Sequence, residues 1–373
     1  MIVIAADTHK STHTFAAVEA ATGRLAAERT FAADEAGMLA VLRWANGLAA
    51  AGERVFALED CRHVSGRLER FLVASGERVI RVAPKLMGAS RRAERSPGKS
   101  DSIDARAVAR AVLERGVDAF PVAWLDERGL EIRLLVDHRG DLVAERTRLQ
   151  SRLRWHLVEL DAELEARLPA GGLDRTVWLD RIARRLAARA QSARVRVARD
   201  ELRRIRELCR QVSKLERELA TLVSAHRPEL LALPGCGVIS AATLIGRTAG
   251  AERFPTDGHF ARLAGVAPIP ASSGRRDRQR LNRGGDRQLN AALHRIAVAQ
   301  GQHHPPAKAY LARKQAERKT RMDALRCLKR QLARRVWCIL RDNAPTPDQA
   351  IHSHMIKTIN NTANAPEPAL ALT

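Results

Sequence analysis

The chain has 373 residues, 45% of them hydrophobic, so it is long enough for two or three domains with buried cores and is not disordered by composition. Its net charge of +22 exceeds what a globular fold requires and indicates a polyanionic partner, DNA or RNA, in preference to an anionic membrane surface. Aromatic residues make up only 3%, which argues against base stacking as the main way of holding nucleic acid.

Cysteine usage and the start of the chain bear on the cellular compartment. The five cysteines are scattered and form no CxxC pair, which argues against a zinc site or a disulfide framework and fits a reducing compartment. The first residues, MIVIAADTHK, lack the charged start and long apolar core of a signal peptide. No run of 18 apolar residues occurs, so we expect no membrane partner and a cytosolic location.

The first part of the chain, residues 1–125, predicts an α/β domain. Apolar and alternating runs mark its strands, which are expected at 2–6, 13–19, 25–31, 54–59 and 77–84. Helical periodicity marks its helices, which are expected near 34–50, 62–75, 85–93 and 102–115. Three opening strands followed by alternating helices and strands are the element order of the ribonuclease H-like fold.

The middle of the chain, residues 126–226, predicts long helices with two leucine-rich seams of the coiled-coil type. The first seam comprises Leu142, Leu149, Leu153, Leu157, Leu160, Leu164 and Leu168, and the second comprises Leu202, Ile205, Leu208, Val212, Leu215, Leu219 and Leu222. Pro169 and two glycines break the first helix. The seams fit either a hairpin within the chain or pairing with a second subunit.

The C-terminal part divides into a globular unit and a tail. Residues 227–340 predict a second unit that is mostly helical. Residues 341–373 are rich in asparagine and proline, and we expect this tail to be mobile.

Four carboxylates are candidates for a metal site. Asp7 and Glu59 each end a predicted strand, and in a ribonuclease H-like sheet these strands are neighbours, so both side chains reach one edge. Asp101 and Asp104 lie three residues apart and share one side of a helix start. Mg²⁺ prefers such oxygen ligands, and crowded carboxylates repel each other unless cations are bound. Two ions held in this way activate an attacking oxygen and stabilise a leaving oxygen at phosphorus.

Each of these acids, taken singly, also has a structural interpretation. An Asp at a strand end is often a turn residue or helix cap, and acids in a first helical turn are favoured by the helix dipole. The agreement of strand order and position favours the metal site. Asp60, next to Glu59, is a rival for the second ligand.

The segment LLALPGCGVISAATLIG, residues 230–246, predicts a helix-hairpin-helix module. In such modules glycines, here Gly235 and Gly237, let the backbone approach DNA, and amides at a helix N-terminus bind a phosphate. The alternative is an ordinary turn between two helices.

A cluster of arginines follows in residues 265–295, with two neighbouring serines at its start. The arginines are Arg275, Arg276, Arg278, Arg280, Arg283 and Arg287. Arginine suits bidentate phosphate contacts, and a serine oxygen beside such a cluster can attack a phosphodiester while arginines neutralise the developing charge. Ser272 and Ser273 are the candidates, although a loop serine is more often a turn or capping residue. A further basic stretch, Arg313 to Arg335, fits a nucleic-acid-binding helix face and a solvated face equally well.

Several motifs in the same order resemble the insertion-sequence transposases with an Asp-Glu-Asp-Asp, RuvC-like N-terminal domain, the insertion sequence one-ten family. In the N-terminal half they are AADTHKSTHTFAAV, ALEDCRHVSGRLERFL, RVAPKLM and GKSDSIDARAVAR. In the C-terminal half they are LPGCGVISAATLI, RFPTDGHFARLAGVAP and SSGRRDRQRLNRGGDRQLNAAL. With the helical middle, the resemblance covers nearly everything up to about residue 340.

The resemblance implies a serine- and metal-dependent recombinase. The four acids carry over to Asp7, Glu59, Asp101 and Asp104, which would hold Mg²⁺ or Mn²⁺. The family's nucleophilic serine carries over to Ser273, with Ser272 as the alternative because the serine is doubled here. The position before the first Asp, often near a glycine in relatives, is Ala6, which is small enough to leave the assignment intact.

The resemblance also implies partners and an assembly. The expected partners are double-stranded DNA of the element and of the target, together with a structured guide RNA. A phosphoserine link would be passed to a new strand through a four-way junction. The coiled coil would bring subunits together as dimers or tetramers, with the RuvC-like domain of one subunit meeting the serine domain of another.

Two other functions fit parts of the same sequence. A RuvC-like junction nuclease would use the four acids and water, without a covalent link to DNA, but it leaves the serine and arginine cluster unexplained. A nucleic-acid-binding protein without catalysis would use the charge alone, and the presence of all four acids argues against it.

Overall fold

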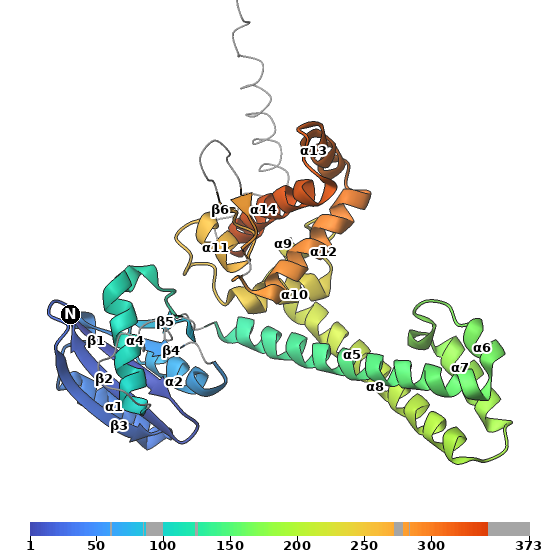
Figure 1. The fold of residues 1–373 in the computed structure, drawn as a ribbon, viewed down its shortest axis with the longest axis horizontal. Coiled ribbons are helices and arrows are strands. Elements are labelled where there is room, and N and C mark those ends of the chain that lie inside the picture. The colour runs from blue at the N-terminus through green and yellow to red at the C-terminus, as the bar shows by residue number, and fades with distance from the viewer. Residues whose placement is uncertain are drawn as a thin grey trace, which may run out of the picture. The chain divides into compact units, whose positions relative to one another are not determined.

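The computed structural model describes residues 1–59, 62–84, 86, 100–123, 126–271, 279–282 and 284–341 (Figure 1). The chain forms two compact units, Met1–Asp126 and Glu127–Thr373. The predicted helix near 85–93 and the predicted mobile tail lie outside the described residues, apart from isolated positions at their edges.

The first unit is built on a five-stranded sheet whose strand order is β3-β2-β1-β4-β5. The strands are β1 (Ile2–Thr8), β2 (Thr12–Glu19), β3 (Leu25–Ala32), β4 (Arg54–Glu59) and β5 (Val79–Val82). The first three strands pair antiparallel, and β4 and β5 continue parallel to β1. This mixed order is the one predicted for a ribonuclease H-like domain.

Helices cover both faces of this sheet. On one face, α4 (Asp101–Arg115) packs its small residues, among them Ala107 and Ala111, on the odd-numbered residues of β1 and β4. The opposite face is covered by α1 (Glu35–Asn46) and α2 (Arg62–Ala74). Because alanines have short side chains, α4 can lie close to the sheet, which brings its first turn to the end of β1.

Two short 3₁₀ helices and a buried ion pair complete this unit. The 3₁₀ helices are η1 (Ala51–Glu53) and η2 (Val117–Ala119). Arg81 on β5 donates two hydrogen bonds of 2.6 Å to the carboxylate of Glu69 on α2, and both side chains are buried. The pair ties α2 to the edge strand β5. Removing either partner would leave a buried charge without its counterion.

The second unit contains two long helices, α5 (Glu127–Leu160) and α8 (Ala193–His226), which pair antiparallel within the chain (Figure 1). The first seam faces the start of the second, Leu202 to Leu208, in one apolar core. Leu219 and Leu222, at the end of the second seam, belong to another core. An ion pair of 2.6 Å between Arg139 and Glu216 fixes the register of the hairpin. Of the two pairings that the sequence left open, the structure therefore has the hairpin within the chain.

The first of these helices is shorter than its leucine seam predicts. It ends at Leu160, because the side chain of Asp161 accepts a hydrogen bond from the Leu164 amide and so starts a new short helix, α6 (Ala162–Ala166). Arg185 donates to the same carboxylate. The last leucines of the first seam consequently pack from α6 and the following turn. A 3₁₀ helix, η3 (Gly172–Asp174), and α7 (Thr176–Ala187) close this end of the hairpin.

The other end of the hairpin belongs to a helical core, as predicted for this region. Its elements are α9 (Pro228–Leu231), α10 (Val238–Thr248), α11 (Asp257–Leu263), β6 (Ile269–Pro270), β7 (Gln279–Arg280), α12 (Arg287–His303), α13 (Pro305–Ala316) and α14 (Arg321–Leu340). Ile132 of α5 and Leu219 of α8 are fully buried in this core. Within the described part of the chain, no helix is long and apolar enough to cross a membrane.

Replacing Gly246 by alanine tests the close packing of α10 on α5. The added Cβ would lie 2.7 Å from Cβ and 2.8 Å from Cα of Arg133, so the two helices must separate. We expect Gly246→Ala to lower the free energy of unfolding by about 1–3 kcal/mol. Gly140→Ala is the control, because its Cβ meets nothing within 4 Å on α5 and should stabilise by about 1 kcal/mol. Denaturant unfolding measures both, and changes of the same sign would contradict this packing.

Candidate functional site

Asp7 and Glu59 lie at the carboxyl ends of two neighbouring parallel strands. The register of β1 and β4 pairs Ala6 with Leu58, so Asp7 and Glu59 are the next residues in line. Side chains alternate along a strand, and the odd-numbered residues of both strands pack under α4. By this alternation, both carboxylates belong to the face of the sheet that α4 covers.

The first turn of α4 adds two further carboxylates. The helix begins at Asp101 because the Ser100 hydroxyl caps it, accepting a hydrogen bond of 3.3 Å from the Ile103 amide. Asp104 is one turn further along and is buried, whereas Asp101 is exposed. The four predicted acids therefore come from three elements, and all three elements end or begin at the same edge of the sheet. We call this edge the acidic edge.

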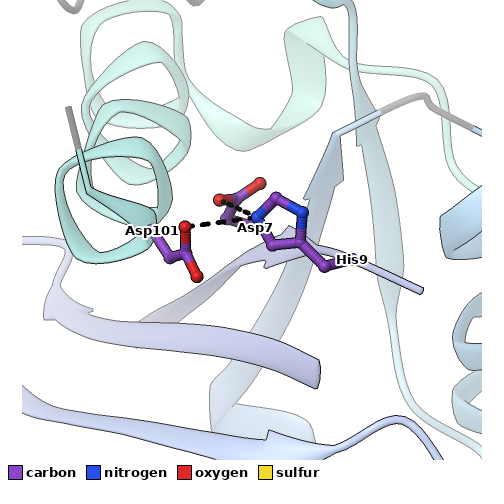
Figure 2. A group of neighbouring side chains, drawn as sticks. All are labelled: Asp7, His9 and Asp101. Carbon is purple, nitrogen blue, oxygen red and sulfur yellow. Dashed lines mark hydrogen bonds and ion pairs between the residues drawn. The ribbon is translucent and has the colours of Figure 1, made fainter. Parts of the chain in front are cut away.

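A histidine joins this group from the turn after β1. The Nε2 atom of His9 lies 3.1 Å from Oδ2 of Asp7 and 3.3 Å from Oδ1 of Asp101. Figure 2 shows the imidazole ring reaching both carboxylates, one from the end of β1 and one from the start of α4. His9 was missed by the sequence reasoning, which considered only acids. The available signal was a histidine two residues after the strand-end aspartate.

The electrostatics of the site centre on Asp7, which is 5% exposed. Burial raises the pKa of the Asp7 carboxyl above its ordinary value of 3.8, and the negative charges of Asp104 and Asp101 raise it further. The imidazole of His9 opposes this shift through its charge and its hydrogen bond. Holding Asp7 ionised therefore costs free energy, which a bound cation would recover.

The donor atoms fit a divalent cation. One ligand atom each from Asp7, His9 and Asp101 can be chosen so that all three lie within 4.8 Å of one another. Two carboxylate oxygens and one imidazole nitrogen are donors that divalent ions accept. The negative charge of Asp104 also raises the pKa of Asp7, so this buried carboxylate belongs to the same group of acids. Asp60, the rival for the second ligand, lies outside the described residues.

The turn between α9 and α10 carries the predicted hairpin glycines. Gly235 has φ +77°, and a Cβ there would meet Cβ of Ala299 at 3.0 Å and the carbonyl oxygen of Ile296 at 3.2 Å. A glycine is therefore required at this position for packing on α12, and the predicted approach of this turn to DNA stays a prediction. Gly237 precedes α10 and has nothing within 4 Å of the position of a Cβ, so the helix start remains accessible. Burial raises the pKa of the intervening Cys236 to about 12, which leaves its thiol unreactive.

Most of the predicted serine and arginine cluster lies outside the described residues. This applies to Ser272, Ser273, Arg275, Arg276, Arg278 and Arg283. The two described members, Arg280 on β7 and Arg287 at the start of α12, are both exposed. Exposed guanidinium groups at these positions can contact phosphates.

The two ends of the cluster segment are pinned together. β6 pairs antiparallel with β7. A Cβ on Gly285 would lie 2.3 Å from the amide nitrogen of Gly265, so the backbones touch. The Asn290 amide donates to the carbonyls of Ala264 and Gly265 at 2.8 and 3.1 Å, and the Lys329 ammonium donates to the Asn290 side-chain oxygen at 2.6 Å. The segment between these ends thus starts and finishes at one fixed place on the helical core.

The basic stretch from Arg313 to Arg335 forms the end of α13 and most of α14. Several of its charges are paired, such as Arg330 with Asp257 at 2.9 Å and Lys314 with Glu317 at 2.8 Å. Its leucines, Leu328 among them, are buried in the helical core. The predicted amphipathic pattern is therefore present in this stretch. Binding of nucleic acid by its basic face stays a prediction.

Comparison with known proteins defines the class. A family model described as "Transposase" matches residues 4–161, and one described as "Transposase IS116/IS110/IS902 family" matches residues 227–312. The two matches cover both the sheet with its acidic edge and most of the helical core. The protein is thus a transposase, an enzyme that recombines DNA.

Relatives narrow the class to a family. The chain is 27% identical to the 42 kDa protein of insertion element IS900 from Mycobacterium paratuberculosis, over 91% of this chain and 95% of that one. It is 28% identical to the 44.8 kDa protein of IS116 from Streptomyces clavuligerus, over 75% and 81%. It is 29% identical to the 43.6 kDa protein of IS110 from Streptomyces coelicolor, over 65% and 71%. The chain belongs to the IS110 family of insertion-sequence transposases.

Solved structures also match, among them that of T. thermophilus RuvC in complex with a Holliday junction substrate. The match covers 33% of this chain and 99% of that one, at 13% identity and a TM-score of 0.26. The ribonuclease H-like order of the first unit is given by its own sheet, β3-β2-β1-β4-β5.

Replacing Asp7 by asparagine tests the cost of its buried charge. The folded-state pKa is raised, so the ionised carboxylate destabilises the metal-free protein as pH rises from 3.8 through the raised pKa, and the full cost is present at neutral pH. Asparagine has nearly the same shape and cannot ionise. We expect Asp7→Asn to unfold at a higher temperature than the wild type at pH 7.5 in EDTA.

The control for this experiment is Asp101→Asn, which neutralises an exposed carboxylate of the same group. We expect no gain in stability there, because the exposed charge is hydrated and favoured by the helix start. Thermal unfolding followed by circular dichroism measures both variants. A less stable Asp7→Asn protein in EDTA would show that the buried charge carries no cost.

Proposed function

We propose that this transposase cuts and rejoins insertion-element and target DNA with a divalent metal, Mg²⁺ or Mn²⁺, and a serine nucleophile. The metal ligands in this proposal are Asp7, Glu59, Asp101 and Asp104. The observation that supports it is the meeting of Asp7 from β1 with Asp101 and Asp104 from α4. The register of β1 and β4 puts Glu59 at the neighbouring strand end.

The residues of the acidic edge have separable tasks. Asp7 supplies a rigid carboxylate, because burial between sheet and helix fixes its side chain. Asp101 and Asp104 are placed by the first turn of a capped helix. When bound, a divalent ion polarises a phosphoryl oxygen and offsets the charge that develops at phosphorus. Without it, four carboxylates at one edge would repel the DNA backbone.

The proposed nucleophile is Ser273, which the family resemblance favours over Ser272. The Oγ atom forms a bond to phosphorus while the bond from phosphorus to one DNA oxygen breaks, and that oxygen leaves with a proton. A hydroxyl of the new strand later attacks the phosphoserine, which restores the serine and joins the strands. Of the arginine cluster, Arg280 and Arg287 lie among the residues that the structure describes, and both are exposed and can neutralise the charge on the phosphate.

Partners and assembly follow from the resemblance and from the charge of +22. Besides DNA, we propose a structured guide RNA and a dimer or tetramer as the working assembly, acting in the bacterial cytosol or nucleoid. In such an assembly the acidic edge of one subunit serves the serine of another. The pairing of α5 with α8 inside the chain leaves the outer faces of the hairpin for contacts between subunits.

Replacing Ser273 by alanine tests the nucleophile. If its Oγ attacks phosphorus, Ser273→Ala forms no covalent protein–DNA adduct and gives no recombinant product, whereas Ser272→Ala retains both. Denaturing gels of the full-length protein, incubated with element and target DNA, guide RNA and Mg²⁺, reveal the adduct as a shifted band. An adduct formed by Ser273→Ala would assign the nucleophile elsewhere.

Two outcomes of the same reaction would favour other functions. Free cut ends of a four-way junction, with Mg²⁺ and without any adduct, would indicate a junction nuclease that uses water. DNA binding that weakens steeply with salt, without any metal-dependent product, would indicate a binding protein without catalysis.

Asp7→Ala is the metal-site variant, and we expect it to abolish recombination.

Replacing Arg280 and Arg287 together tests their contact with phosphates. Each phosphate contact contributes about 0.9 to the slope of log K against log salt, so losing two should reduce the slope by about 1.8. The matched control is Arg24→Ala with Arg78→Ala, two exposed arginines that are ion-paired with acids in the first unit. Fluorescence anisotropy on duplex DNA over a range of salt measures both slopes, and equal slopes would remove these arginines from the interface.

A further inference from the structure

The imidazole of His9 has the position of a metal ligand. We propose that His9 Nε2 binds the catalytic cation together with Asp7 and Asp101, and that this nitrogen makes the site hold Mn²⁺ more tightly than Mg²⁺. The inference deepens the proposed metal site and rests on it.

The distances fit neighbouring ligands of one ion. In an octahedral site with metal–ligand distances of about 2.1 Å, adjacent ligand atoms lie about 3.0 Å apart. His9 Nε2 lies 3.1 Å from Asp7 Oδ2 and 3.3 Å from Asp101 Oδ1. The two contacts made by this nitrogen thus have the length of two edges of one coordination octahedron (Figure 2).

The contact with Asp7 is also a hydrogen bond, whereas the contact with Asp101 is an ion pair alone. Nε2 carries at most one proton, so the hydrogen bond to Asp7 leaves none for the Asp101 oxygen at 3.3 Å. A divalent cation in that place would contact all three groups at once and would neutralise both carboxylates.

The backbone holds His9 in this place before any ion binds. Its amide donates a hydrogen bond of 2.9 Å to the carbonyl of Thr12, which closes the turn between β1 and β2. Asp7 is fixed by burial and Asp101 by the Ser100 cap. Because all three ligands sit on ordered elements, the cation would not have to order a loop.

The chemical identity of the three ligand atoms determines which cation the site binds more tightly. Mg²⁺ favours oxygen ligands and keeps several waters, so an imidazole adds little to its binding. Transition-metal ions bind imidazole nitrogen more readily than Mg²⁺ does, and among them Mn²⁺ also suits carboxylates. A site with one nitrogen and two carboxylates is therefore expected to favour Mn²⁺ over Mg²⁺.

Electron spin-echo spectroscopy of full-length protein loaded with one equivalent of Mn²⁺ tests the inference directly. Nitrogen bound to Mn²⁺ produces ¹⁴N modulation of the echo. We expect this modulation in the wild type and in His259→Gln, a histidine control in the second unit, and its loss in His9→Gln. Because the wild-type spectrum needs no variant, the test does not depend on whether a variant folds.

Isothermal titration with each ion gives the second readout. We expect His9→Gln to weaken Mn²⁺ binding at least tenfold and Mg²⁺ binding less than threefold, while Asp7→Asn loses both ions. Absence of any cation binding by the wild type would overturn the proposed metal site itself. Tight Mn²⁺ binding without ¹⁴N modulation, and unchanged by His9→Gln, would overturn the role of His9 and leave the carboxylate site standing.

Discussion

The electrostatics of the first unit centre on one buried carboxylate, that of Asp7. Asp7 lies between the sheet and α4, where desolvation and two neighbouring acids raise its pKa. A protein that only needed to fold would place an apolar or neutral residue there. The fold keeps the charge by surrounding it with groups that can share a cation. The stability of this edge and its chemistry are consequently two aspects of the same electrostatic balance.

In the second unit, close contact between two backbone segments holds a part of the proposed active site in place. Gly265 and Gly285 approach each other too closely for any side chain, and Asn290 bonds the carbonyls beside them. Burial lowers the pKa of Lys329, and its bond to Asn290 offsets part of the cost of burying that ammonium. These contacts fix both ends of the segment that carries the serines.

Much of the first unit could be predicted because its pattern is local. Short apolar runs located β1 and β4, and the expected strand order then placed Asp7 and Glu59 on one edge. His9 was missed because its role requires the turn after β1 to fold back toward α4, a long-range contact that no local pattern encodes. The sequence also could not choose between a hairpin and an intersubunit coiled coil, since both bury the same leucines.

The end of α5 shows how a side chain can override periodicity. The leucine spacing continues to Leu168, but Asp161 caps a new helix and is held by Arg185. A cap of this kind contributes about 1 kcal/mol, enough to decide where a helix stops once the apolar residues are buried in either arrangement. Periodicity identified which residues are buried, and capping decided which helix carries them.

The proposed chemistry divides between the two units. The acids belong to residues 1–126 and the serines to residues 127–373, so neither unit alone contains every group that the proposed reaction needs. A phosphorus atom must meet both sets within a few ångströms for phosphoryl transfer to occur. Separation of this kind favours a reaction that is completed only when nucleic acid has brought the partners together. An isolated subunit would then hold a poised metal edge and a poised serine without cutting DNA, which suits an enzyme whose premature action would damage its host.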